Sequence, residues 1–171
     1  MANTYRYCPQ CARLLEDRLV FGRVRQVCPV CGFIHFCNPK VGAATLIEHG
    51  GQILLLLRPP DDVFGPDTWC LPAGFVEHDE SPQEAAAREA EEETGLQVKV
   101  GQLFGAYFYT DDPRGNGVLI VYRATVVDGE MRPQRDEVAA LRWFHFTDLP
   151  ENLSGGGLGP AIRQWAKEKR A

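Results

Sequence analysis

The sequence predicts an α/β fold of the α+β type, in which helices cover a mixed β-sheet and a small cysteine-bearing module comes first. Three observations predict it. Residues 37–171 alternate between apolar, strand-like segments and two segments with helical signals. Residues 1–36 hold four of the six cysteines, as two Cys-x-x-Cys pairs. The length of 171 residues and the hydrophobic content of 44% suit one medium domain with a small module attached.

The first element, residues 1–36, is predicted to form around a metal ion. Cys8 and Cys11 form one Cys-x-x-Cys turn, and Cys28 and Cys31 form a second one after 16 intervening residues. Each turn presents two thiolates, and two turns complete the tetrahedron that Zn²⁺ prefers. Four sulfur ligands leave no open position, so we expect a structural site that supplies much of the folding free energy of this segment. Reduced core thiols or two redox pairs are the alternative interpretation.

Three more residues near this module or in the next one carry ligand-type atoms. His35 follows the last of the four cysteines and is a candidate replacement ligand, although such a histidine is more often a polar surface residue. Cys37 and Cys70 lack a Cys-x-x-Cys partner, and we expect both to be buried thiols. Pro39 keeps the preceding residue out of the helical region, which predicts a linker or turn at residues 37–39.

The next elements are predicted to be strands. Residues 41–48 and 53–58 flank His49-Gly50-Gly51, and two consecutive glycines favour a tight hairpin turn. A turn-rich loop follows at residues 59–67. Further strands are expected at residues 98–109, 118–127 and 141–146.

Two helices are predicted, at residues 82–94 and 160–169. The first has a capping box formed by Ser81 and Glu84, with Pro82 at its first position, and Gly95 follows as a natural stop. Ala86 and Ala90 lie four residues apart, which would let this helix approach a sheet closely.

The first helix carries an unusual cluster of acidic side chains. Glu89, Glu92 and Glu93 stand at positions i, i+3 and i+4, so they share one face. Like charges at this spacing repel, and the last turn of a helix is unfavourable for anions. A divalent cation would reverse this cost, because clustered carboxylates suit Mg²⁺ or Mn²⁺. A solvated acidic face is the alternative.

The spacing around this helix resembles a known motif. Gly74, Glu80 and the run 88–96 (Arg-Glu-Ala-Glu-Glu-Glu-Thr-Gly-Leu) match the Nudix box at every fixed position, with Ala90 as a small occupant of an apolar position. The chain from about residue 41 to 150 also resembles a Nudix domain, including Trp-Cys-Leu-Pro-Ala-Gly at 69–74 and Leu-Arg-Trp-Phe at 141–144. The cysteine module resembles the zinc ribbon that precedes this domain in NADH-pyrophosphatase-like and related hydrolases.

The resemblance implies a fold, a reaction and a set of site residues. It implies an α/β/α sandwich and a hydrolase that cleaves the pyrophosphate of a nucleoside diphosphate linked to another moiety, assisted by Mg²⁺ or Mn²⁺. The implied metal ligands are the box carboxylates, a later loop glutamate and a backbone carbonyl: Glu89, Glu92, Glu93, Glu137, and Ala73 or Gly74. The implied catalytic residues are Glu92 and Glu93, Arg88 paired with Glu80 or another box carboxylate, and Glu137. Glu137 as an exposed loop residue is the alternative.

The substrate prediction rests on a sequence run that this chain lacks and on a few candidate side chains. NADH-pyrophosphatases resemble one another in a Ser-Gln-Pro-Trp-Pro-Phe-Pro run, whereas residues 103–112 here read Leu-Phe-Gly-Ala-Tyr-Phe-Tyr-Thr-Asp-Asp. We therefore expect ADP-ribose or another ADP-linked dinucleotide such as FAD, and disfavour NADH. Candidate substrate contacts are Trp69, Tyr107 and Tyr109 for stacking, Arg58 and Arg114 for phosphate, and Glu77 and His78 near the box. Strand aromatics are more often core residues, and an arginine or a turn histidine is more often a surface residue.

Charge and hydropathy argue against a general nucleic-acid binder and against a membrane protein. The formal net charge is −5, yet residues 1–36 carry five arginines against two acidic residues, so the remaining residues carry −8. An acidic chain is a poor general nucleic-acid binder. No apolar run approaches the length of a membrane helix, and no secretory signal is visible, which predicts a soluble cytoplasmic protein with reduced cysteines. The alternative function is a non-catalytic nucleotide sensor or an RNA-binding regulator that uses the ribbon. Homodimerisation is an expectation from the family.

Overall fold

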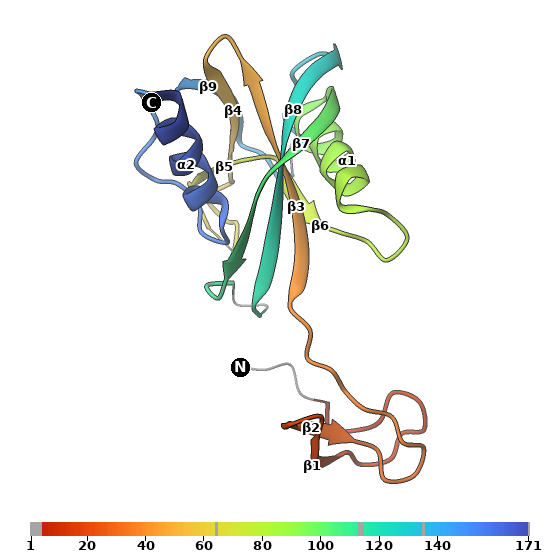
Figure 1. The fold of residues 1–171 in the computed structure, drawn as a ribbon. Helices are drawn as coiled ribbons and strands as arrows, with labels where there is room; N and C mark the ends of the chain where they lie inside the picture. Colours follow the sequence, from red (N-terminus) through yellow and green to blue (C-terminus); the bar gives the residue numbers. More distant parts are fainter. Residues whose placement is uncertain (1–4, 64, 113–114, 135, 171) are drawn as a thin grey trace. The chain divides into compact units, whose positions relative to one another are not determined.

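The computed structural model of the chain describes residues 5–63, 65–112, 115–134 and 136–170. The chain forms two compact units, Met1–Pro39 and Lys40–Ala171 (Figure 1). Among the described residues, no helix combines the length and the apolar character that a membrane crossing requires.

The first unit is a hairpin with a cysteine turn at each side. Strands β1 (Glu16–Val20) and β2 (Arg23–Val27) pair antiparallel. Each cysteine turn has the same pattern: the N–H of Cys8 donates to the carbonyl of Arg13 at 2.7 Å, and the N–H of Cys28 donates to the carbonyl of Phe33 at 2.8 Å. The repetition of one turn geometry brings the two Cys-x-x-Cys pairs to face each other.

The second unit contains a seven-stranded mixed sheet. Its strands are β3 (Lys40–His49), β4 (Gln52–Leu57), β5 (Trp69–Cys70), β6 (Ala73–Phe75), β7 (Leu96–Tyr109), β8 (Gly117–Gly129) and β9 (Ala140–His145). The order is β5-β4-β3-β8-β7, with β6 also paired to β3 and β9 to β4. Only β3 and β8 pair in parallel among these strands; the other pairs are antiparallel.

Strands β3 and β4 meet only at their hairpin, and this divides the sheet. Their paired residues are Glu48 with Ile53 and His49 with Gln52. Gly50 and Gly51 have φ values of 56° and 77°, which a side chain would disfavour. Beyond the hairpin β3 runs with β6 and β8, whereas β4 runs with β5 and β9. The two halves therefore separate and leave room between them.

Helices α1 (Pro82–Thr94) and α2 (Leu158–Arg170) lie on opposite sides of the strands (Figure 1). Ala85 and Ala86 of α1 pack in one cluster with Ala43 of β3. Ile162 and Trp165 of α2 are fully buried in the largest cluster. The predicted mixed α/β sandwich is thus confirmed, and α1 has the bounds that the sequence predicts. The two short strands β5 and β6 were not expected, because two or three residues around Pro72 carry no readable period.

Candidate functional site

Helix α1 is held in place at both ends by the residues that the sequence indicates. Ser81 accepts a hydrogen bond from the N–H of Glu84, and the Glu84 carboxylate accepts one from the N–H of Ser81. Gly95 ends the helix in the left-handed region at φ 74°. Buried Ala86 and Ala90 bring the helix close to the sheet, so its acidic face borders β6.

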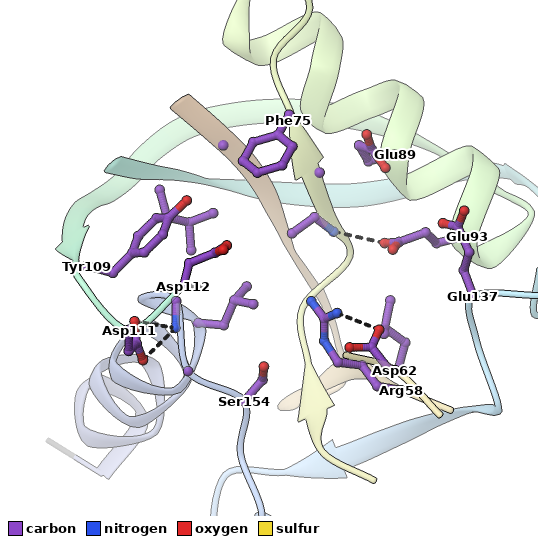
Figure 2. A pocket seen from close by; sticks show the side chains of 18 residues that line it. Arg58, Asp62, Phe75, Glu89, Glu93, Tyr109, Asp111, Asp112, Glu137 and Ser154 are labelled. Carbon is purple, nitrogen blue, oxygen red and sulfur yellow. Dashed lines mark hydrogen bonds and ion pairs between the residues drawn. The ribbon is translucent and has the colours of Figure 1, made fainter. Parts of the chain in front are cut away.

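A cavity of about 440 Å³ opens between α1, the short strand β6 and the start of α2 (Figure 2). This volume lies in the range of small-molecule sites. Its walls combine acidic, basic, aromatic and glycine residues: Gly42, Leu56, Arg58, Asp62, Ala73, Gly74, Phe75, Glu89, Glu93, Tyr109, Asp111, Asp112, Leu119, Glu137, Ser154, Gly155, Gly156 and Leu158.

Glu93 is the most buried carboxylate of the cavity, with 9% of its surface exposed. Its Oε2 accepts a hydrogen bond from the N–H of Ala73 at 2.9 Å. Burial, together with the negative charges of Glu89 and Glu137, raises the pKa of Glu93 to about 8, although the Ala73 N–H opposes this rise. A carboxylate in such a position is suited to a cation that would compensate its charge.

Glu89 lies directly against the backbone of β6. A Cβ atom on Gly74 would overlap the Glu89 carboxylate, so only glycine leaves space for it here. Burial raises the pKa of Glu89, and the ion pair with Arg88 at 2.8 Å offsets part of this rise. Glycine at this position therefore forms a cradle for a carboxylate.

Arg88 connects the box carboxylates. Its Nε and Nη2 donate to the two oxygens of Glu80 at 3.0 and 2.7 Å, and its Nη1 donates to Glu89 and to Glu92 at 2.8 and 3.0 Å. Its Nη2 also donates to the carbonyl of Phe75 at 3.2 Å. The bond from Arg88 lowers the pKa of Glu80 to about 2. Arg88 thus fixes the loop before α1, strand β6 and the acidic face in one arrangement.

The glutamates of the predicted set differ in their surroundings. Glu137 is exposed but lines the same cavity as Glu89 and Glu93. The N–H of Gln134 donates to the carbonyl of Glu93 at 3.3 Å, which ties the loop that carries Glu137 to the end of α1. Glu92 and Glu80 bind Arg88 and are not among the described cavity-lining residues.

The carboxylates fit a divalent metal ion by their donor chemistry. Hard oxygens from Glu89, Glu93 and Glu137, with the carbonyls of Ala73 and Gly74 beside them, are what Mg²⁺ or Mn²⁺ prefers. No three of these carboxylate oxygens in the described structure lie within 4.8 Å of one another.

Arg58, which was predicted to bind substrate, supplies a positive charge on the cavity wall beside these acids. Its Nη1 forms an ion pair with Asp62 at 3.0 Å, and its buried Nε has no hydrogen-bond acceptor among the described residues. Behind it lies Cys70, fully buried, and burial raises the pKa of the Cys70 thiol to about 12. Arg58 is therefore held by Asp62, and its side chain lines the cavity.

The other predicted substrate contacts lie at different places. Tyr109 lines the cavity. Trp69 packs edge-on against Phe144, with ring centroids 4.7 Å apart, and Tyr107 donates to Gln164 at 2.8 Å. These two, together with Glu77 and the exposed His78, are not among the described residues of the cavity wall. Arg114 lies outside the described residues.

Five polar or aromatic wall residues were not predicted: Asp62, Phe75, Asp111, Asp112 and Ser154. Asp62 follows Arg58 by four residues in a loop, and Asp111 and Asp112 follow the end of β7. Ser154 opens the run Ser-Gly-Gly-Gly at residues 154–157, before α2. That glycine-rich run before a helix is a signal that could have indicated a ligand-facing loop.

The four cysteines of the first unit form one cluster. Their sulfur atoms all lie within 4.8 Å of one another, with Cys8 to Cys31 at 3.5 Å and Cys11 to Cys28 at 3.4 Å. The N–H of Cys31 points at the Cys28 sulfur and lowers the pKa of that thiol to about 6. A group of four sulfurs this close together suits a soft metal such as Zn²⁺.

The remaining candidates around this cluster behave differently. His35 stacks on Tyr5 at 4.5 Å and bonds Gln26 at 3.3 Å, so it lies apart from the four-sulfur group. Cys70 is buried as expected, whereas the expectation for Cys37 is wrong: it is exposed, because it lies in the irregular segment 35–39 at the end of the first unit rather than in a core.

Comparison with known proteins gives a family and several relatives. The model of the NUDIX domain matches residues 38–164. The chain is 30% identical to the NAD-capped RNA hydrolase NudC of Stutzerimonas stutzeri over 148 residues, which cover 86% of this chain and 51% of that protein. It is 38% identical to the ADP-ribose pyrophosphatase of Methanocaldococcus jannaschii over 117 residues, which cover 68% of each. The chain thus spans about half the length of that NudC relative.

Solved structures give the same result for the fold. A NUDIX hydrolase from Nitrosomonas europaea superimposes with a TM-score of 0.83 at 28% identity and covers 97% of this chain and 93% of its own. A MutT NUDIX hydrolase from Burkholderia pseudomallei gives 0.66 at 32% identity, over 74% of this chain and 98% of its own. The first of these extends the likeness across both units.

Proposed function

The chain belongs to the NUDIX family, and on that premise we propose that it hydrolyses the pyrophosphate bond of a nucleoside diphosphate linked to another moiety, with the help of a divalent metal ion. One observation carries this proposal. Glu89, Glu93 and Glu137 line a single cavity of small-molecule size, beside the guanidinium of Arg58.

Glu89, Glu93 and Glu137 would hold Mg²⁺ or Mn²⁺, together with the carbonyl of Ala73 or Gly74. A bound ion of this kind neutralises charge on the pyrophosphate and lowers the pKa of a coordinated water. Glu92 is half exposed and bound to Arg88, so it would reach the same ion only after leaving that partner.

The side chains supply the rest of the proposed chemistry. Glu93, buried in the cavity and held by the N–H of Ala73, is placed to accept a proton from an attacking water at its carboxylate. Arg58 lines the same cavity, and its guanidinium is placed to bind a phosphate of the substrate. Arg88 and Glu80, which are not among the described wall residues, would act by positioning the acidic face. Tyr109, which was predicted to stack on the substrate, lies on the cavity wall.

We propose ADP-ribose, or a related ADP-linked dinucleotide such as FAD, as the substrate. The likeness to an ADP-ribose pyrophosphatase over 68% of both chains supports it. Residues 103–112 lack the run that NADH-pyrophosphatases share, which makes NADH a less favoured substrate.

We further propose that residues 1–36 form a zinc ribbon and residues 37–171 the hydrolase domain. Four sulfurs within 4.8 Å of one another support a structural Zn²⁺ at Cys8, Cys11, Cys28 and Cys31. Such a site needs reduced thiolates, which fits the cytoplasm. Association into a homodimer stays a prediction.

A substrate panel tests the proposed function. The full chain, loaded with Zn²⁺, is incubated with ADP-ribose, FAD, NADH and nucleoside triphosphates in the presence of Mg²⁺ or Mn²⁺, and the products are identified by chromatography. We expect AMP from ADP-ribose only when the divalent ion is present. A folded, metal-loaded protein that hydrolyses none of these compounds contradicts the proposal.

A further inference from the structure

The cavity has a second polar wall, on the side away from Glu89, Glu93 and Glu137 (Figure 2). Ser154 belongs to it and is 5% exposed. Its hydroxyl faces the cavity and has no hydrogen-bond partner among the described residues (Figure 2). The hydroxyl keeps contact with the solvent in the cavity, so it can exchange a water molecule for a hydrogen bond to a ligand.

The position of Ser154 is fixed by its backbone. Its N–H donates to the carbonyl of Trp69 at 2.9 Å, and its carbonyl accepts from the N–H of Gly159 at 3.0 Å. The hydroxyl is therefore held at the cavity wall by β5 and by the first turn of α2, and it does not depend on a flexible side chain.

Asp111 holds the adjacent loop against the end of β7. Both of its carboxylate oxygens accept the N–H of Gly156, at 3.2 and 3.1 Å. Gly155 has no space for a Cβ atom, which would overlap the Asp111 carboxylate. This closeness sets the wall between β7 and α2 and leaves the neighbouring Asp112 half-buried and directed into the cavity (Figure 2).

From this arrangement we propose that Ser154 and Asp112 form a subsite for a sugar diol of the substrate. A serine hydroxyl donates and accepts, and a carboxylate accepts strongly, so each of the two side chains on this wall can bind a sugar hydroxyl. The metal-binding carboxylates lie on the other side of the cavity, which places this subsite beyond the pyrophosphate (Figure 2). The proposal deepens the proposed function and rests on it for the identity of the ligand.

Two sugars of ADP-ribose carry such a diol, and three compounds distinguish them. ADP-ribose has both, the β-methyl ester of ADP lacks the distal ribose, and the 2′,3′-dideoxyadenosine analogue of ADP-ribose lacks the adenosine diol. The kcat/KM of each is measured with Mg²⁺ for the wild type, Ser154→Ala, Asp112→Ala and the control Asp148→Ala. Asp148 is exposed and lies outside the cavity wall.

We expect Ser154→Ala and Asp112→Ala each to lower kcat/KM for ADP-ribose by about tenfold, the loss of one good hydrogen bond. The analogue that lacks the bound diol should be insensitive to both substitutions, and its retained turnover shows that each variant is folded. Equal losses on all three compounds, or no loss on any, would overturn the proposal.

Equilibrium binding separates this inference from the proposed function. The same three compounds are titrated calorimetrically into the full chain without divalent ions. Suppose that no compound is hydrolysed, but ADP-ribose binds about tenfold more tightly than one diol-free analogue. If Ser154→Ala then abolishes this difference in affinity, the subsite is supported and the proposed reaction is contradicted. Identical affinities for all three compounds would overturn the subsite itself.

Discussion

Arg88 and Glu80 form a two-bond ion pair, with nitrogen–oxygen distances of 3.0 and 2.7 Å, across eight residues of sequence. The pair joins the loop before α1 to the helix itself. Through the remaining nitrogen of Arg88 it also sets the place of Glu89. The Arg88–Glu80 pair thus positions the carboxylates of the cavity.

This ion pair predicts a specific dependence of stability on pH. Arg88 lowers the pKa of Glu80 from 4.5 to about 2 in the folded chain. The stabilisation is fully present above pH 4.5 and is lost as the pH falls toward 2. Glu80→Gln should therefore lower the urea midpoint at pH 7, and the difference from wild type should shrink between pH 4.5 and pH 2.

The exposed Glu151→Gln is the matched control for this substitution, and its urea midpoint should follow the wild type at each pH. A Glu80→Gln variant as stable as the wild type at pH 7 would show that the pair contributes nothing to folding.

Gly74→Ala should weaken metal binding. The added Cβ overlaps the Glu89 carboxylate and forces it to turn away, whereas the backbone of β6 can remain. We expect the Mg²⁺ concentration for half-maximal activity to rise about tenfold. Gly101→Ala on β7, outside the cavity wall, is the control and should leave the Mg²⁺ titration unchanged. An unchanged titration for Gly74→Ala would remove Glu89 from the metal site.

The four-sulfur cluster predicts about one zinc ion per chain in a preparation without chelators. Cys28→Ser should lose that zinc, because three thiolates bind the ion less well than four. Cys37→Ser, which changes an exposed thiol outside the cluster, should keep it. Elemental analysis of both variants decides the matter, and equal zinc contents would refute the assignment of Cys28.

Cys70 and Cys37 should differ in their reaction with iodoacetamide. Burial raises the pKa of Cys70 to about 12, so its thiol stays protonated at pH 8 and is shielded by the core. Cys37 is exposed. Mass spectrometry of the zinc-loaded native chain should find Cys37 alkylated and Cys70 intact, and both alkylated in urea. Native alkylation of Cys70 would contradict its burial.

The sequence predicts the local features of the site well, since they depend on neighbours along the chain. The bounds of α1 follow from Ser81, Pro82 and Gly95, and the cysteine spacing predicts a cluster that the structure contains. Spacing cannot separate Glu92 from Glu93, which share one predicted face. In the structure Glu93 turns to the N–H of Ala73, whereas Glu92 stays half exposed on Arg88.

The second wall of the cavity could not be predicted, because distant segments build it. Asp111 follows β7, Ser154 precedes α2, and only the pairing of the sheet brings them to one cavity. The aromatic candidates fail for a similar reason: Trp69 meets Phe144 of β9 through the pairing of β4 with β5 and β9, which strand propensity alone does not reveal.

The most direct test of the account is the kcat for ADP-ribose of Glu93→Gln beside that of Glu92→Gln, at saturating Mg²⁺ and with folding verified by circular dichroism. If the buried carboxylate at Ala73 serves the reaction, Glu93→Gln should lose activity by on the order of 10²-fold or more, and Glu92→Gln should lose much less. Full activity of Glu93→Gln would contradict the account.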